Sequence, residues 1–164
     1  MAKEIERKFL VKGDEWRRSA SAGTRLRQGY LSDGGNAAVR VRIAEDRAFI
    51  TVKAARPGRV RDEFEYPIPV TDAEQMLALC TGAILEKTRF RIPEGRYVWE
   101  VDVYAGDNAG LVLAEIELDG EEATFGKPSW LGPEVTDAQQ FYASKLSRRS
   151  FKEWSAAERA EWLR

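Results

Sequence analysis

The sequence predicts an α+β domain built around an antiparallel meander of about eight strands. Most of the chain alternates apolar and polar residues with period two, which is typical of strands with one buried face. Turn-forming residues, mainly Gly, Pro, Asn and Asp, separate several of these segments at 33–36, 56–58, 93–95 and 106–108. Strands joined by short turns are usually antiparallel neighbours, and a meander of this length is able to close into a barrel.

Eight alternating segments are the expected strands. Val, Ile, Phe, Tyr and Trp fill many of their apolar positions, and these residues favour extended backbone. The expected bounds are residues 4–11, 25–31, 38–43, 49–54, 62–68, 85–92, 97–104 and 111–118.

Three further segments carry helical signals. Thr71 followed three residues later by Glu74, and Ser155 followed by Glu158, match the capping-box pattern, and Thr136 is expected to cap a helix between them. A shorter turn is expected at residues 14–19, and residues 126–133 are expected to form a loop. The apolar residues expected on these helices are Met76, Leu77, Leu79, Phe141, Tyr142, Leu146, Trp162 and Leu163.

The length of 164 residues suits one domain that spans residues 1–164. Lysine and arginine total 26 and the acidic residues total 27, which gives a formal net charge of −1. A protein that coats nucleic acid would carry a basic excess, so we expect no nucleic-acid partner. The many charged residues must therefore act through their placement.

Several classes of protein are disfavoured by residues that the sequence lacks. It shows no apolar run that would serve as a signal peptide or cross a membrane, so we expect a cytoplasmic protein with no membrane partner. A single cysteine excludes a disulfide framework. Because there is no histidine, any catalysis would depend on carboxylates, Lys, Arg, Tyr or water activated by a metal ion.

Charged residues occupy almost every position on one face of seven of the expected strands. In the first strand, for example, Glu4, Glu6 and Lys8 alternate with Ile5 and Phe9. Asp, Glu and Lys are depleted in strands, and the solvated faces of ordinary sheets contain many uncharged polar residues. The other charged positions of these faces are Arg40, Arg42, Lys53, Glu63, Glu65, Lys87, Arg89, Arg91, Glu100, Asp102, Glu115 and Glu117.

Two interpretations of this charged face stay open, because periodicity does not say which face is inside. The face is either exposed to water, as in most antiparallel sheets, or enclosed by a closed barrel. Enclosed charges of both signs would need ligands or one another to offset their desolvation. A polyanion together with a divalent metal ion would satisfy both signs, and helices would then cover the apolar outer face.

The pattern of Glu4, Glu6 and Lys8 resembles the ExExK signature of the CYTH domain, the family of triphosphate tunnel metalloenzymes. Residues 27–31 read Arg-Gln-Gly-Tyr-Leu, which is similar to a stretch of the small bacterial members. The later charged strands follow in the family's order, and residues 135–137 and 142–145 resemble its final helix. The resemblance therefore covers nearly the whole chain.

The resemblance implies a closed antiparallel barrel of about eight strands around a tunnel, with helices packed outside and a C-terminal helix. It also implies that basic side chains bind a triphosphate while carboxylates hold Mg²⁺ or Mn²⁺. The implied substrate-binding residues are Lys8, Arg40, Arg42, Lys53, Lys87 and Arg89, and the implied metal ligands are Glu4, Glu6, Glu63, Glu65, Asp102, Glu115 and Glu117.

Within the family the chain most resembles tripolyphosphatases, which implies metal-dependent hydrolysis of inorganic tripolyphosphate to pyrophosphate and phosphate. Nucleoside or thiamine triphosphatase, class IV-type adenylate cyclase and a non-catalytic module that binds polyphosphate or nucleotides stay open as alternatives. The chain lacks the His-Phe pair that is typical of the cyclase subgroup. The implied partner is a small-molecule triphosphate, bound by a monomer or homodimer.

Tyr30 and Lys8 resemble a catalytic dyad of such members, in which the ammonium prepares the phenol to take a proton from water. In a second interpretation the metal activates the water and Tyr30 only positions it. In a third, Tyr30 is a core residue without a catalytic role.

Overall fold

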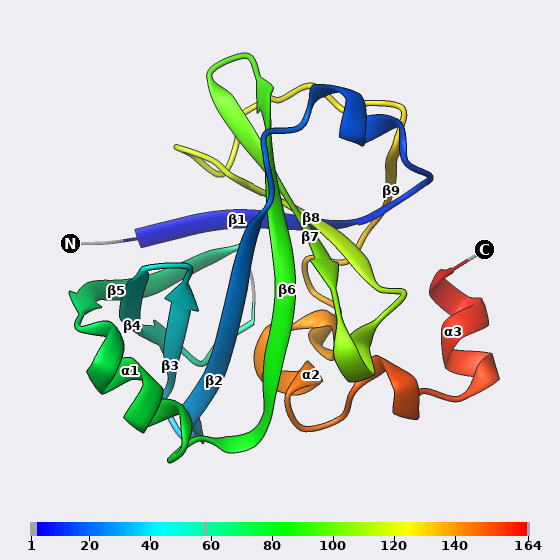
Figure 1. Ribbon diagram of the computed structural model, residues 1–164. Helices are drawn as coiled ribbons and strands as arrows, with labels where there is room; N and C mark the ends of the chain where they lie inside the picture. The colour runs from blue at the N-terminus through cyan, green and yellow to red at the C-terminus, as the bar shows by residue number, and fades with distance from the viewer. Residues whose placement is uncertain (1–2, 58, 164) are drawn as a thin grey trace.

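The closed antiparallel barrel that the sequence predicts is present. The computed structural model of the protein describes residues 3–57 and 59–163. Within these residues nine strands lie in the order β5-β4-β3-β2-β6-β7-β8-β1-β9, and a further pairing of β1 with β5 closes β1 to β8 into a barrel (Figure 1). The strands are β1 (Lys3–Val11), β2 (Thr24–Gly34), β3 (Ala37–Ala44), β4 (Arg47–Ala54), β5 (Val60–Ile68), β6 (Thr81–Glu94), β7 (Tyr97–Tyr104), β8 (Val112–Glu117) and β9 (Leu131–Glu134).

The predicted strand bounds are confirmed to within a few residues at most ends. The largest difference is at β6, which begins at Thr81 and not at residue 85. Gly82 breaks the alternation there, but Thr81 still pairs with Tyr30 of β2. The expected loop at 126–133 is wrong at its end, because Leu131–Glu134 forms β9 beside β1. Gly132 and Pro133 hide this short strand from a pattern search.

The helices are short and few. No helix in the described part of the chain combines the length and the apolarity needed to span a membrane. The α-helices are α1 (Val70–Leu77), α2 (Ala143–Leu146) and α3 (Ala156–Trp162), and the 3-10 helices are η1 (Glu15–Ser19), η2 (Gly106–Asn108), η3 (Gln139–Phe141) and η4 (Phe151–Glu153).

Of the three predicted helix caps, one is confirmed and two are wrong. Ser155 caps α3, and its side-chain oxygen accepts a hydrogen bond from the Glu158 N–H at 3.2 Å. Thr71 lies inside α1, whose N-cap position is Pro69. Thr136 caps no helix: its hydroxyl accepts a hydrogen bond from the Lys8 backbone N–H at 3.0 Å, so it joins the C-terminal segment to β1. The expected single helix after it is divided into η3 and α2.

The outer apolar face of the barrel is covered in two places, and only one of the covers is an α-helix. Ala73 and Leu77 of α1 pack on β3 and β4. On the other side, Trp16 of η1 and Trp130 of the loop before β9 pack around Trp99 of β7. The expectation that three helices cover the outside is therefore only partly correct.

One end of the barrel is filled with apolar side chains, which we call the apolar plug. Inward-facing residues of β1, β6, β7 and the start of β8 meet the segment that runs from the end of β9 to η4 and the residue after it. Three of its aromatic members are in edge contact, because the Trp154 ring centroid lies 5.1 Å from that of Phe141 and 5.2 Å from that of Phe151. The apolar plug consists of Leu10, Leu85, Tyr104, Leu111, Leu113, Val135, Phe141, Leu146, Phe151 and Trp154.

Candidate active site

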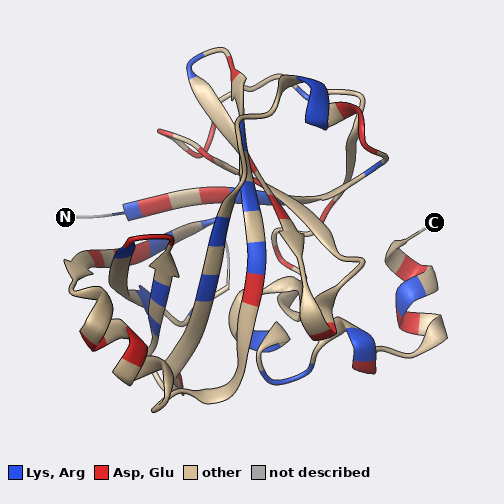
Figure 2. Cartoon of the chain, in the orientation of Figure 1, with Lys and Arg blue, Asp and Glu red and all other residues tan. Residues whose placement is uncertain are grey.

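The charged faces of the strands point into the barrel and line a cavity of about 360 Å³, which we call the charged channel. Figure 2 shows charged residues interspersed with uncharged ones along β1 and β6, and the cavity lining includes Glu4, Glu6 and Lys8 of β1 and Lys87, Arg89 and Arg91 of β6. The enclosed arrangement is therefore the correct one of the two left open by periodicity. Among the residues that line the charged channel are Glu4, Glu6, Lys8, Tyr30, Arg40, Arg42, Lys53, Arg61, Glu63, Glu65, Lys87, Arg89, Glu100, Glu115 and Glu117, together with Asp33, Arg91, Gln139, Tyr142 and Lys145.

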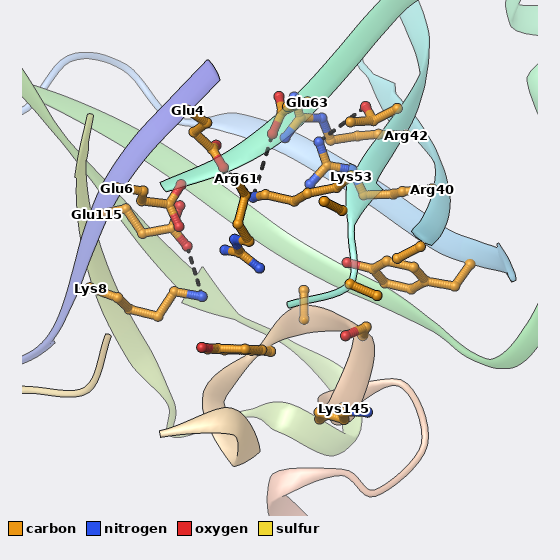
Figure 3. Close-up of a pocket in the computed structure, with 18 of the residues that line it drawn as sticks. Glu4, Glu6, Lys8, Arg40, Arg42, Lys53, Arg61, Glu63, Glu115 and Lys145 are labelled. Atoms are coloured by element: carbon orange, nitrogen blue, oxygen red, sulfur yellow. Dashed lines mark hydrogen bonds and ion pairs between the residues drawn. The ribbon is translucent and has the colours of Figure 1, made fainter. Parts of the chain in front are cut away.

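Most channel cations are held by carboxylates from neighbouring strands. The Lys53 Nζ atom lies 2.6 Å from a Glu4 oxygen and 3.4 Å from a Glu63 oxygen, and these contacts tie β4 to β1 and β5 (Figure 3). The Lys8 Nζ atom lies 3.3 Å from a Glu115 oxygen. Alternation on β1, β4 and β5 brings these side chains to the same enclosed space.

Arg40 and Arg42 form a second group on β3. The Nη2 atoms of both arginines lie 3.5 Å from the same Glu65 oxygen. This oxygen also accepts a hydrogen bond from Thr51 at 2.9 Å. The buried Nε atoms of both arginines have no partner in the described residues. Burial, together with Arg40 and Arg89, lowers the pKa of Arg42 to about 10. These two N–H donors are therefore buried and unsatisfied, in arginines that line the cavity.

Asp102 is buried behind the channel surface and forms ion pairs with a third group of cations, Lys87 and Arg89. Its oxygens lie 2.7 Å from Lys87 Nζ and 2.7 and 2.8 Å from Arg89 Nε and Nη2. Asp102 is completely buried, and Arg89 and Lys87 outweigh that burial and lower its pKa. Burial lowers the pKa of Lys87 to about 8, against the attraction of the shared Asp102. The predicted metal-binding role of Asp102 stays a prediction, and both of its oxygens already bind cations.

Carboxylates crowd together where β1 pairs with β8. Glu6 lies opposite Glu117 and Lys8 lies opposite Glu115 in the strand register. Burial and then repulsion from Glu115 raise the pKa of Glu6 to about 8. Burial and then Glu6 raise the pKa of Glu117. Negative charge is therefore in local excess on this wall.

The chemistry of this wall fits a hard divalent cation. Within residues 3–57 and 59–163, no three side chains of metal-binding types already converge on one point. Carboxylate oxygens are nevertheless the ligands that Mg²⁺ and Mn²⁺ prefer. The repulsion from Glu115 that helps to raise the pKa of Glu6 would be relieved by a bound cation.

Tyr30 and Lys8 share the channel, but no contact joins them in the described residues. Tyr30 is buried on β2 and lies opposite Arg40 in the strand register. The Lys8 ammonium donates to the Phe141 carbonyl at 3.5 Å and lies 5.5 Å from the centroid of the Tyr142 ring. The proposed dyad stays a prediction.

Arg61 and Tyr142 are channel residues that sequence reasoning missed. The Arg61 guanidinium carbon lies 5.3 Å from the centroid of the Tyr142 ring, and Arg61 points toward Lys8 (Figure 3). Arg61 makes no ion pair with any described carboxylate, unlike the predicted channel cations. The sequence did contain a signal for Arg61, because this residue begins the alternation of charged residues that continues through Glu63 and Glu65.

Comparisons with known proteins agree with this geometry. The chain matches the CYTH domain family over residues 2–151. An inorganic triphosphatase of Acetivibrio thermocellus is 43% identical over 153 residues, which cover 93% of this chain and 97% of the relative. An inorganic triphosphatase of Nitrosomonas europaea is 36% identical over 149 residues, which cover 88% of this chain and 96% of the relative.

Solved structures share the same fold. The crystal structure of an inorganic triphosphatase, 32% identical, superimposes with a TM-score of 0.63 and covers 90% of this chain and 95% of that one. A protein of Pyrococcus horikoshii, 18% identical, has a TM-score of 0.57 and covers 73% of this chain and 80% of that one. From the closed barrel, its charged channel and the match over nearly the whole sequence, we conclude that this chain belongs to the CYTH domain family.

Proposed function

We propose that this protein hydrolyses inorganic tripolyphosphate to pyrophosphate and phosphate with the help of Mg²⁺ or Mn²⁺. The observation that supports it best is an enclosed channel in which cations and carboxylates face each other across one cavity. Two relatives that align over almost the whole chain are named inorganic triphosphatases, which supports the same substrate. Such a channel offers ligands to a linear polyanion along its whole length.

The cations act by binding the phosphate oxygens and stabilising the charge that spreads over them during transfer. Arg40 and Arg42 offer unpartnered Nε donors on one wall, and Lys53 and Arg89 offer charge from the others. In phosphoryl transfer, positioning and electrostatic stabilisation supply most of the catalysis. Arg61 adds a cation that no described carboxylate neutralises, and we include it in the substrate-binding set.

The carboxylate wall would hold the metal ion. Glu6, Glu115 and Glu117, with Glu4 beside them, are the residues proposed for this role, and Glu63 and Glu65 stay in the wider predicted set. When bound, a divalent cation would neutralise phosphate charge and polarise a phosphoryl oxygen.

Tyr30 is proposed to contact the attacking water through its phenol oxygen. The water oxygen bonds to a terminal phosphorus, the bond from that phosphorus to the bridging oxygen breaks, and pyrophosphate leaves. The proton that the water loses goes to the phenolate form of Tyr30 in one role and to solvent in the other. Tyr30→Phe separates the two roles left open for this residue. If Tyr30 accepts the proton, kcat falls on the order of a hundredfold or more and its pH dependence changes; if it only positions the water, the loss is about tenfold or less with an unchanged pH profile.

A phosphate-release assay tests the proposal. The protein is incubated with tripolyphosphate and Mg²⁺ or Mn²⁺, and in parallel with excess chelator. We expect release that depends on the metal and that falls on the order of tenfold or more in Glu117→Gln. A panel with ATP, GTP and thiamine triphosphate, with detection of cyclic AMP, compares the alternative activities. Thermal stabilisation by tripolyphosphate without any release would instead identify a binding module.

The remaining parts of the proposal, on domain organisation, oligomeric state, location and partner, come from the sequence. We propose that it acts as one domain, as a monomer or homodimer in the cytoplasm, on a small-molecule triphosphate and not on nucleic acid. The balanced net charge of −1 supports the last point.

A further inference from the structure

Gln28 is a buried side chain whose polar atoms have no partner in the described residues. It lies on β2 with 0% of its surface exposed, and neither its Oε1 nor its Nε2 atom makes a hydrogen bond. A buried amide without partners costs free energy, so such groups are normally bonded to the chain, to water or to a ligand. The proposed function assigns no role to this residue.

The position of Gln28 limits where its partners come from. In the strand register it lies between Arg42 of β3 and Leu85 of β6, and the residues on either side of it on the same face are Leu26 and Tyr30. Leu85 belongs to the apolar plug and Leu26 is buried, so neither side chain offers a hydrogen bond. Gln28 therefore lies between the channel residues Arg42 and Tyr30 and the apolar side chains of Leu26 and Leu85, and is not itself among the residues that line the cavity.

The neighbouring arginines show the same shortage of partners. The buried Nε atom of Arg42, the register partner of Gln28, is unpartnered, and so is that of Arg40 two residues away on β3. Two unsatisfied N–H donors and one unsatisfied amide thus occupy neighbouring register positions on one stretch of the barrel wall. The phosphate oxygens of a bound tripolyphosphate would accept hydrogen bonds from the N–H groups of all three side chains.

The carbonyl oxygen of the amide needs a donor, which an ionised phosphate does not provide. A water molecule does, and Tyr30, the residue proposed to contact the attacking water, is on the same face two residues away. An amide that donates to a phosphate oxygen and accepts from water fixes the two relative to each other. In some enzymes of phosphoryl transfer a glutamine likewise orients the attacking water.

We propose that Gln28 is a positioning residue: its Nε2 donates to a phosphate oxygen held by Arg42, and its Oε1 accepts a hydrogen bond from the water that attacks phosphorus. This inference rests on the proposed function and names a further residue of the same site. Gln28 forms and breaks no covalent bond and takes no proton.

The test compares steady-state kinetics of tripolyphosphate hydrolysis in three variants. Gln28→Met keeps the length of the side chain but removes both hydrogen-bonding atoms. Gln28→Glu keeps the acceptor, removes the donor and adds a charge that repels phosphate. Gln75→Met makes the same chemical change at an exposed position of α1 on the outside of the barrel, and is the matched control.

We expect Gln28→Met to lower kcat on the order of tenfold to a hundredfold while KM stays within about threefold. Its melting temperature should stay unchanged or rise, because an amide without partners in the chain is replaced by an apolar group of similar size. Gln28→Glu should lower kcat and also raise KM. Gln75→Met should match the wild type in all three measurements.

Three results would overturn the inference. If Gln28→Met retains the wild-type kcat in a protein that hydrolyses tripolyphosphate, the inference fails and the proposed function stands. The same holds if Gln28→Met loses activity only in proportion to a large drop in melting temperature, because the amide then serves the fold. If the wild type releases no phosphate with either metal, the proposed function fails, and the inference fails with it.

Discussion

The charged channel and the apolar plug are built from the same inner face of the same strands. On β1 the inner face changes from Lys8 to Leu10, and on β6 from Leu85 to Lys87. Leu113 and Glu115 make the same change on β8. Each change takes two residues, which is about 7 Å along a strand. Strand alternation thus decides which side chains are enclosed, but the division of the enclosed face into two regions depends on single residues along each strand.

The two regions differ in what their burial does to stability. The apolar plug removes Phe141, Leu146 and other apolar side chains from water, which stabilises the fold. The charged channel buries ionised groups, and that burial moves the pKa of Lys87 down to about 8 and that of Glu6 up to about 8. Each of these shifts disfavours the charged form. We therefore expect channel substitutions to affect turnover and plug substitutions to affect stability.

The largest expected effect is on activity in the charged channel. Arg42→Ala should lower kcat/KM for tripolyphosphate on the order of tenfold to a thousandfold, because it removes an oriented cation from the charge that develops in the transition state. The free energy of unfolding should change by about 1 kcal/mol or less, since the guanidinium that is lost is buried at a cost. Phosphate release and urea denaturation measure the two quantities.

Arg25→Ala is the control for this substitution. Arg25 is exposed on β2 and faces away from the channel, so its loss should leave both quantities near the wild type. A large loss of stability in Arg42→Ala with little loss of activity per folded molecule would contradict the division between the two regions.

The apolar plug should give the opposite result. Leu111 is fully buried, and Leu111→Ala should lower the free energy of unfolding by about 2–5 kcal/mol, through lost burial and the cavity left behind. The kcat of the molecules that remain folded should stay within about threefold of the wild type. Leu79→Ala, at a side chain that is 73% exposed, is the control. A plug variant that is stable but inactive would show that the plug shapes the site directly.

The strands of the barrel and the charged face of the channel could be predicted from the sequence. Alternation predicted the eight barrel strands, and the density of charge on one face favoured an enclosed channel. The pattern of Glu4, Glu6 and Lys8 then identified the family. These features are local, because neighbouring residues on one strand determine which side chains share a face.

The features that sequence reasoning missed depend on contacts between distant segments. Thr136 resembles a helix cap, but a bond to Lys8, 128 positions away, fixes it instead. Asp102 carries the same charge as the other predicted metal ligands, yet two cations of β6 surround it. Gln28 belongs to the Arg-Gln-Gly-Tyr-Leu motif of residues 27–31, but its lack of hydrogen-bond partners appears only once β3 and β6 are placed beside it.

The pH dependence of binding sharpens the comparison within the channel. Lys87 and Arg89 share the carboxylate of Asp102, and burial leaves Lys87 with a pKa of about 8. Below this pH the ammonium is charged and attracts the substrate; as pH rises through 8 it loses its proton and that attraction. KM for tripolyphosphate should therefore rise severalfold between about pH 7 and 9.5.

Lys87→Arg is the matched variant, because arginine stays protonated throughout this range. Titration of the substrate and of other groups affects both proteins equally, so the difference between their KM profiles reports Lys87. Profiles of the same shape in both proteins would exclude Lys87 as the titrating group.

The smallest expected effect lies at α3, outside both regions. Ser155→Ala removes the oxygen that accepts from the Glu158 N–H, and loss of such a cap costs about 1 kcal/mol of helix stability. Because α3 contains no buried residue, and contacts the plug through Arg159 at Phe151 and Trp162 at Phe141, the cost to global unfolding should be no larger than this. Ser155→Thr keeps the hydroxyl and should restore the wild-type melting temperature. Tripolyphosphate turnover should be unchanged in both variants. A fall in kcat for Ser155→Ala would mean that the order of α3 affects the channel through Phe141, whose carbonyl oxygen accepts a hydrogen bond from Lys8. The plug and the channel would then be one functional unit.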